Sequence, residues 1–152
     1  MQTSLGTKDD IIKIVKVIAE KAEDLVRLTI GRELPITYLT IFSHHPHEYN
    51  RFVEWVTEIG IKSDANNGVR FALQKPIQTA GGEVVNIRIR KPDPYRSQIG
   101  CADLKVDNYD SFKMEELFKY PDNLRVIERP EYEMIEFFDF NTNDVLAYVV
   151  SK

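Results

Sequence analysis

The sequence has a single cysteine, Cys101, and three histidines that stand together at His44, His45 and His47. One cysteine allows neither an intramolecular disulfide nor a thiolate cage for a metal ion. The first residues lack the basic-then-apolar pattern of a secretory signal, and no apolar run approaches the length of a membrane span. These absences predict a cytoplasmic protein with no membrane partner.

The motifs that fix a reaction are also missing. There is no G-x-S-x-G elbow, no phosphate-binding loop and no dinucleotide fingerprint. Cys101 lies inside a predicted strand without a histidine near it in sequence, so we expect a buried side chain rather than a nucleophile. The formal net charge of -4 argues against a nucleic-acid partner, because such partners require a basic surface. Whether the protein is an enzyme is left open.

What the sequence does contain is the composition of an ordinary globular chain. Its 152 residues are 43% hydrophobic and 29% charged, which predicts a single domain able to bury one core. Between residues 11 and 29 apolar side chains recur at helical spacing with charges between them, and Gly31 follows. This pattern predicts a long amphipathic helix within residues 1–31. Its apolar stripe would pack against the rest of the chain or against a second copy, the latter giving a homodimer.

After this helix the same order of elements appears twice. Residues 32–94 are predicted to form one β-α-β-β-β module and residues 95–152 a second, and we expect the two to share one domain. In the first module Ser43 or a nearby residue is expected to cap the helix, Gly60 to end it, residues 64–68 to form a turn, and Pro76 to lie in a flexible connection. The predicted fold class is α+β: two βαβββ modules forming a curved mixed sheet around a cleft, preceded by the long helix.

Several segments resemble a known superfamily with this arrangement. The runs NNGVRFALQKPI, VVNIRIRKP and GCADLKV, together with the closing segment IEFFDFNTNDVLAYVV, are similar to the glyoxalase/bleomycin-resistance (vicinal oxygen chelate) superfamily, and to its YecM-like branch in particular. The resemblance covers residues 36–150. It implies two modules around a cleft, a divalent metal held by histidine and glutamate side chains, and chemistry on a small oxygen-rich molecule whose oxygens the metal polarises.

The sequence departs from that superfamily at the implied metal ligands. Tyr38 and Arg88 stand at two of the ligand positions, Asp103 stands at the third, and Ala147 or Tyr148 at the fourth. An arginine cannot ligate a metal and a neutral tyrosine is a poor ligand, so no metal cofactor is favoured. The alternative is a metal-dependent lyase or isomerase whose ligands come from His44, His45, His47, Asp103 and Glu136.

The predicted strands alternate between apolar and polar side chains, which is typical of a sheet with one packed face and one face open to water. By the superfamily's geometry the open face carries Tyr38, Arg88, Arg90, Asp103 and Glu136. Converging arginines suit a carboxylate or phosphate, so the favoured function is binding of a small anionic molecule in the cleft. Two alternatives stay open: an internal lattice of ion pairs, such as Arg88 with Asp103 or Glu136, around an empty groove, and a non-catalytic module that dimerises through its first helix.

Overall fold

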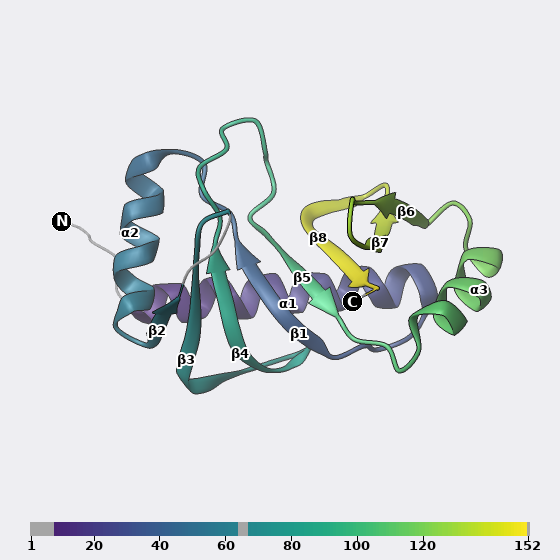
Figure 1. Cartoon of the computed structure of the whole chain (residues 1–152), viewed down its shortest axis with the longest axis horizontal. Coiled ribbons are helices and arrows are strands. Elements are labelled where there is room, and N and C mark those ends of the chain that lie inside the picture. The colour runs from purple at the N-terminus through teal and green to yellow at the C-terminus, as the bar shows by residue number, and fades with distance from the viewer. Residues whose placement is uncertain (1–7, 64–66, 152) are drawn as a thin grey trace.

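The computed structural model in Figure 1 describes residues 8–63 and 67–151, with the backbone alone at Thr142 and Asn143. A long helix is followed by two successive β-α-β-β-β units. The elements are α1 (Lys8–Ile30), β1 (Ile36–Ile41), α2 (Pro46–Thr57), β2 (Gly60–Ser63), β3 (Val69–Thr79), β4 (Gly82–Ile89), β5 (Gly100–Leu104), α3 (Tyr109–Lys119), β6 (Leu124–Glu128), β7 (Glu133–Asp139) and β8 (Thr142–Val150).

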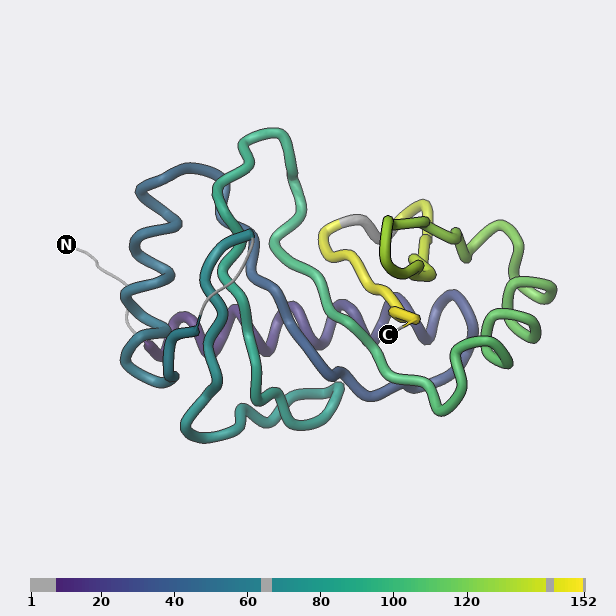
Figure 2. Tube along the Cα trace, viewed as in Figure 1, coloured from purple at the N-terminus to yellow at the C-terminus, as the bar shows by residue number. Residues whose placement is uncertain are grey.

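All eight of these strands form one sheet in the order β2-β3-β4-β1-β5-β8-β7-β6. In each unit the first strand lies parallel to the last, β1 beside β4 and β5 beside β8, and the other strand pairs are antiparallel. The two units meet where β1 and β5 pair antiparallel at the centre of the sheet. The strands of the first unit run up and down the view in Figure 2, whereas β6 and β7 are seen nearly end-on, so the sheet is strongly twisted and curved. The predicted fold class is confirmed.

Helix α1 crosses one face of the sheet and contacts strands of both units (Figure 1). Its apolar stripe is buried against β1, β3, β5, β7 and β8, with Ile11, Val15 and Ile18 each 0% exposed. The helix ends where Gly31 adopts a φ of 68° and donates its N–H to the Arg27 carbonyl, 2.9 Å away. The stripe therefore packs on the helix's own chain, so a homodimer would have to use another surface.

The shorter helices begin at caps that the sequence located only in part. Asn108 caps α3, accepting a hydrogen bond from the Ser111 N–H. For α2 the prediction is Ser43 or a nearby residue, and Ser43 itself is not the cap, because its hydroxyl donates to the Arg90 carbonyl at 2.7 Å. His45 takes the capping position instead, accepting from the Glu48 N–H through Nδ1, and Pro46 follows in the first turn.

Strand β3 runs through Pro76, which corrects the predicted flexible connection. Strand β2 pairs with β3 only from Arg70 to Leu73, and the Gln74 N–H then donates to the Ile59 carbonyl at 2.9 Å. Pro76 lies beyond this last hydrogen bond, where its missing N–H leaves no partner unpaired on that edge. Pairing with β4 is interrupted between Ala72 and Ile77, which accommodates the proline as an irregularity within the strand.

Other sequence predictions fall partly outside the described residues. These are residues 1–7 of the predicted helical segment, residues 64–66 of the predicted turn, and Lys152 at the end of the second module. Gly68, the last residue of that turn, has a φ of 96°, as expected of a glycine at a turn. The boundaries of the modules at residues 32–94 and 95–152 stay a prediction. None of the helices in the described part of the chain is long and apolar enough to span a membrane.

Candidate functional site

The two faces of the sheet differ in the chemistry of their side chains. Toward the helices the strands present apolar residues, and Leu39, Ile87 and Ile135 are each 0% exposed there. The intervening residues face the opposite way, because side chains alternate along a strand. Those residues are polar and charged on the central strands, so the functional candidates lie on the face opposite α1.

Strand pairing sets these side chains in two adjacent rows. In the first row Arg70, Arg88, Thr40 and Cys101 follow one another across β3, β4, β1 and β5. In the second row Tyr38, Asp103, Tyr148, Glu136 and Arg125 follow one another across β1, β5, β8, β7 and β6. The rows bring side chains from both units to the middle of the open face.

A cleft of about 390 Å³ lies over these rows. Five of its lining residues are arginines, from β3, from β4 and from the connections that follow β4 and β6: Arg70, Arg88, Arg90, Arg96 and Arg129. Asp103 is the one carboxylate among the described residues that line it, and Thr40, Cys101, Tyr132 and Tyr148 contribute polar groups. The cleft thus carries a large excess of fixed positive charge in a chain whose net charge is -4.

The ring of Tyr38 packs against two of these arginines. The guanidinium carbons of Arg70 and Arg88 are 5.2 and 5.6 Å from the centre of its ring, close enough for cation–π attraction. Arg70 and Arg88 are also direct partners across β3 and β4, an arrangement in which like charges repel. Arg88 Nε and the Tyr38 hydroxyl are buried without a hydrogen-bond partner in the described residues. Two buried polar groups are thus left without partners beside concentrated positive charge.

Asp103 is half-buried at the meeting point of the two units. Burial raises the pKa of its carboxyl to about 6 against the attraction of Arg88 and Arg70, which lowers it. Burial likewise raises the pKa of the neighbouring Cys101 thiol to about 12, with the Asp103 charge acting in the same direction. The thiol is therefore protonated at neutral pH, and a protonated thiol is a weak nucleophile.

The described residues do not form the alternative that the sequence left open, a lattice of ion pairs around Arg88. Glu136 accepts two hydrogen bonds from Arg125, from Nε at 3.2 Å and from Nη2 at 2.9 Å. Within the described ranges no ion pair joins Arg88 to Glu136 or to Asp103. Of the five predicted residues, Arg88, Arg90 and Asp103 line the cleft. Tyr38 lies beside it, against Arg70 and Arg88, and Glu136 shares the open face but is engaged by Arg125.

The three histidines hold the start of α2. His44 Nδ1 lies 2.9 Å from Glu48 Oε1, and His44 Nε2 lies 2.9 Å from the Gln98 carbonyl. Burial lowers the pKa of His44, but the hydrogen bonds to Gln98 and Glu48 outweigh it and the net shift is upward. His47 Nε2 lies 2.7 Å from Arg51 Nη2. In the part of the chain that the structure describes, no three His, Cys, Asp or Glu side chains are arranged to hold a metal ion.

His45→Ala should lower the free energy of unfolding by about 1 kcal/mol, because it removes the acceptor that caps α2. For a chain of this size that corresponds to roughly 2–4 °C in melting temperature. His47→Ala, at an exposed position one residue after the proline, should stay within about 0.5 kcal/mol. Thermal unfolding of both variants measures the difference. A zinc-dependent rise in melting temperature that both substitutions abolish would instead favour the metal alternative.

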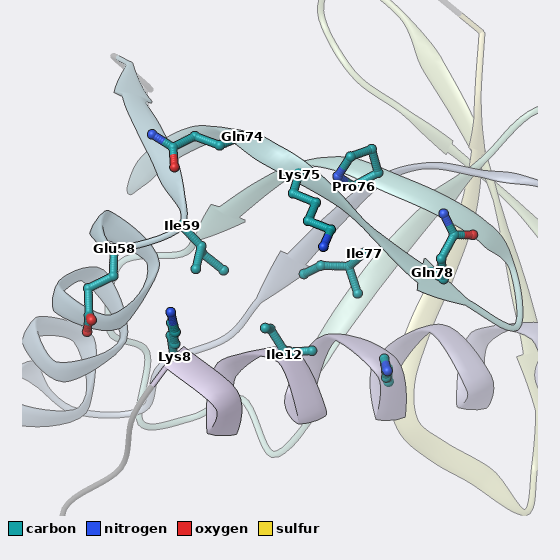
Figure 3. A pocket seen from close by; sticks show the side chains of 10 residues that line it. Lys8, Ile12, Glu58, Ile59, Gln74, Lys75, Pro76, Ile77 and Gln78 are labelled. Carbon is teal, nitrogen blue, oxygen red and sulfur yellow. The ribbon is translucent and has the colours of Figure 1, made fainter.

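A separate hollow of about 460 Å³ lies away from the arginines, between the start of α1, the end of α2 and β3 (Figure 3). Ile12, Ile59 and Ile77 face one another across it, and Lys8 and Lys75 extend into it from opposite sides. Neither of the two buried unpartnered polar atoms belongs to this hollow. The arginine-lined cleft is therefore the candidate site.

Sequence reasoning missed several residues of the cleft. Arg70 lies between the apolar Val69 and Phe71 on β3. The same alternation of polar and apolar residues, applied to this strand, would have predicted Arg70 on the open face. Arg96 and Arg129 lie in connections, where no periodicity indicates which way a side chain points. The missed arginines more than double the charge that Arg88 and Arg90 bring to the site.

Comparisons with known proteins give a fold and no family. No protein-family model matches the chain, and no curated protein matches its sequence. A solved structure titled "Structural Genomics, Protein EC4020" superposes with a TM-score of 0.70 at 13% identity, covering 100% of this chain and 94% of that one. A "putative dioxygenase" from Bacillus subtilis subsp. subtilis str. 168 gives a TM-score of 0.28 at 17% identity over 78% of this chain and 41% of that one, too low to carry an argument. The chain shares the fold of the first structure along its whole length.

Proposed function

We propose that this protein binds a small anionic molecule, a carboxylate or a phosphate, in the arginine-lined cleft of a glyoxalase-like fold. The observation that carries the proposal is a pair of buried, unpartnered groups, Arg88 Nε and the Tyr38 hydroxyl, at a cleft lined by five arginines of which Arg88 is one. A buried donor without an acceptor is costly, and an anion in the cleft would supply the missing acceptor. Guanidinium groups hold carboxylate and phosphate oxygens in pairs, which suits either ligand.

The order of elements and the quoted segments support placement in the vicinal oxygen chelate superfamily, with the YecM-like branch as the finer proposal. The residues present do not fit the metal that this superfamily implies. Tyr38, Arg88 and Asp103 stand at three implied ligand positions, and Ala147 or Tyr148 at the fourth. Asp103 alone offers an anionic oxygen, and the nearby guanidinium groups repel a cation. We therefore assign to the arginines the attraction for ligand oxygens that a metal supplies elsewhere.

Sulfate, phosphate and small dicarboxylates should raise the melting temperature of the protein, and Arg88→Ala should remove most of that effect. A ligand at a hundred times its Kd stabilises by about 2.7 kcal/mol, which is roughly 5–10 °C for a chain of this size. Differential scanning fluorimetry over a concentration series, followed by titration calorimetry, measures both the shift and Kd.

Arg51→Ala is the matched control, because it removes the same charge from α2, outside the cleft. Sulfate and phosphate also stabilise proteins in general by exclusion from the surface, and both variants keep that contribution. A sulfate shift of equal size in Arg88→Ala and in wild type would contradict the proposal.

A further inference from the structure

A second cavity adjoins the arginine-lined cleft. This neighbour has a volume of about 610 Å³ and shares Asp103 and Val150 with the cleft as common walls. It lies where β5 and β8 end and β1 begins, and the connection from β5 to α3 closes its far side. Tyr38 lines it as well, while the same ring packs against Arg70 and Arg88 of the cleft. The two cavities meet at Tyr38, Asp103 and Val150.

The chemistry changes from one cavity to the other. The second cavity contains no arginine among its described lining residues, and its other charged residues are one lysine and one aspartate, Lys105 and Asp107. Val106 and Val150 give it apolar surface, and Tyr109 adds an aromatic wall. The Tyr109 hydroxyl donates to Glu133 Oε2 at 2.9 Å, and Lys113 Nζ lies 2.7 Å from the same oxygen. That wall is therefore fixed in place and close to neutral.

The volumes exceed what an inorganic anion needs. At about 30 Å³ per water molecule, 390 Å³ is room for roughly a dozen waters, of which one sulfate or phosphate displaces a small part. Sites that bind organic molecules are mostly apolar, with a few polar groups that fix orientation. Here the arginines of the cleft supply the polar groups that fix orientation, and the second cavity supplies apolar surface.

We propose that the ligand is an organic anion that spans both cavities, with its acidic group at the arginines and an uncharged, apolar or aromatic body in the second cavity. Tyr38 lines the second cavity while its ring packs against Arg70 and Arg88 of the cleft, so it lies beside the part of the ligand that links the acidic group to the body. This inference rests on the proposed anion binding and adds the class of ligand.

The test compares inorganic phosphate with phenyl phosphate, which carries the same acidic group with an aromatic body. Wild-type protein should bind phenyl phosphate about tenfold or more tightly, because burying one ring removes on the order of 100 Å² of apolar surface from water. Titration calorimetry at one pH and one ionic strength gives both values of Kd.

Thr37→Trp should cancel this preference by filling the second cavity. Thr37 is exposed on β1 and lines the second cavity but not the arginine-lined cleft. Its affinity for inorganic phosphate should stay within about twofold of wild type, which also shows that the variant is folded. Val85→Trp, at an exposed position of β4 outside both cavities, is the matched control and should keep the preference.

The outcomes separate this inference from the proposed function. If wild type binds phosphate and phenyl phosphate equally well, anion binding stands and the spanning ligand is overturned. The spanning ligand is also overturned if Thr37→Trp keeps the full preference. If wild type binds neither compound, both proposals are overturned.

Discussion

The affinity of the cleft for sulfate should fall about 10- to 100-fold as the pH rises from 5 to 8. Asp103 has a pKa of about 6 and ionises across this range, whereas sulfate keeps its charge. The carboxylate that forms neutralises part of the field of Arg70 and Arg88 and repels the anion. Two unit charges about 5 Å apart interact by roughly 3 kcal/mol at an effective dielectric constant near 20, which sets the upper end of the range.

Asp103→Asn should abolish this pH dependence. The variant carries no charge there at any pH, so at pH 8 it should bind sulfate about as tightly as wild type does at pH 5. Asp122→Asn, in an exposed turn, removes the same charge far from the cleft and should retain the wild-type slope. Calorimetric titration with sulfate at four pH values and constant ionic strength measures these affinities. A flat wild-type profile would show that Asp103 and the anion do not share a site.

Without a ligand, the pH dependence of the free energy of unfolding should also be set by the Asp103 carboxyl. The folded pKa of Asp103 lies above the usual 3.8, so the native state holds its proton more tightly than the unfolded chain does. Stability is then lost as the pH rises from about 4 to 6, and the unfavourable contribution is fully present above 6. Denaturant unfolding at pH 7 should find Asp103→Asn more stable than wild type by on the order of 2 kcal/mol.

Strand periodicity predicted which side chains share the open face. Arg88 and Asp103 alternate with apolar neighbours and Tyr38 precedes the apolar Leu39, and a period of two places them on one side wherever the strands pair. The same reasoning failed to find the partner of Glu136, because Arg125 faces it only through the register of β6 and β7. Register depends on turn geometry and on packing between strands, which one sequence does not display.

The proline and the histidines show a different limit. Pro76 reads as a strand breaker, yet it is tolerated in β3 because the neighbouring strand has already ended. His45 reads as a metal ligand because it stands among histidines, yet its ring nitrogen replaces the usual serine or aspartate at a helix cap. Both residues follow known rules of hydrogen bonding in strands and at helix caps. The sequence does not show where the neighbouring strand ends or which N–H lies near the histidine ring, and these positions decide how each rule applies.

Gly68→Ala should lower the melting temperature by roughly 10–15 °C, although it adds only one methyl group. Gly68 has a φ of 96°, where an L-residue is strained, and an added Cβ would lie 1.9 Å from the Ile89 carbonyl oxygen and 2.9 Å from Arg90 Cα. Both obstacles are backbone atoms of the segment that carries Arg90, so no side-chain rotation relieves them. Strain of about 1–3 kcal/mol and overpacking of a similar or larger size combine.

Gly82→Ala isolates the contribution of the clash. Gly82 has a φ of 104°, so its alanine variant meets the same backbone strain, but an added Cβ would have no atom within 4 Å. This variant should therefore lose only about 1–3 kcal/mol of stability, or roughly 2–12 °C in melting temperature. Because Asn67 and Arg70 beside Gly68 line the cleft, Gly68→Ala should also weaken sulfate binding at temperatures where it is still folded, whereas Gly82→Ala should not. Equal losses of stability in the two variants would mean that the backbone around Gly68 moves to accommodate the added Cβ. The close approach of Gly68 to the Ile89–Arg90 backbone would then not fix the position of Arg90.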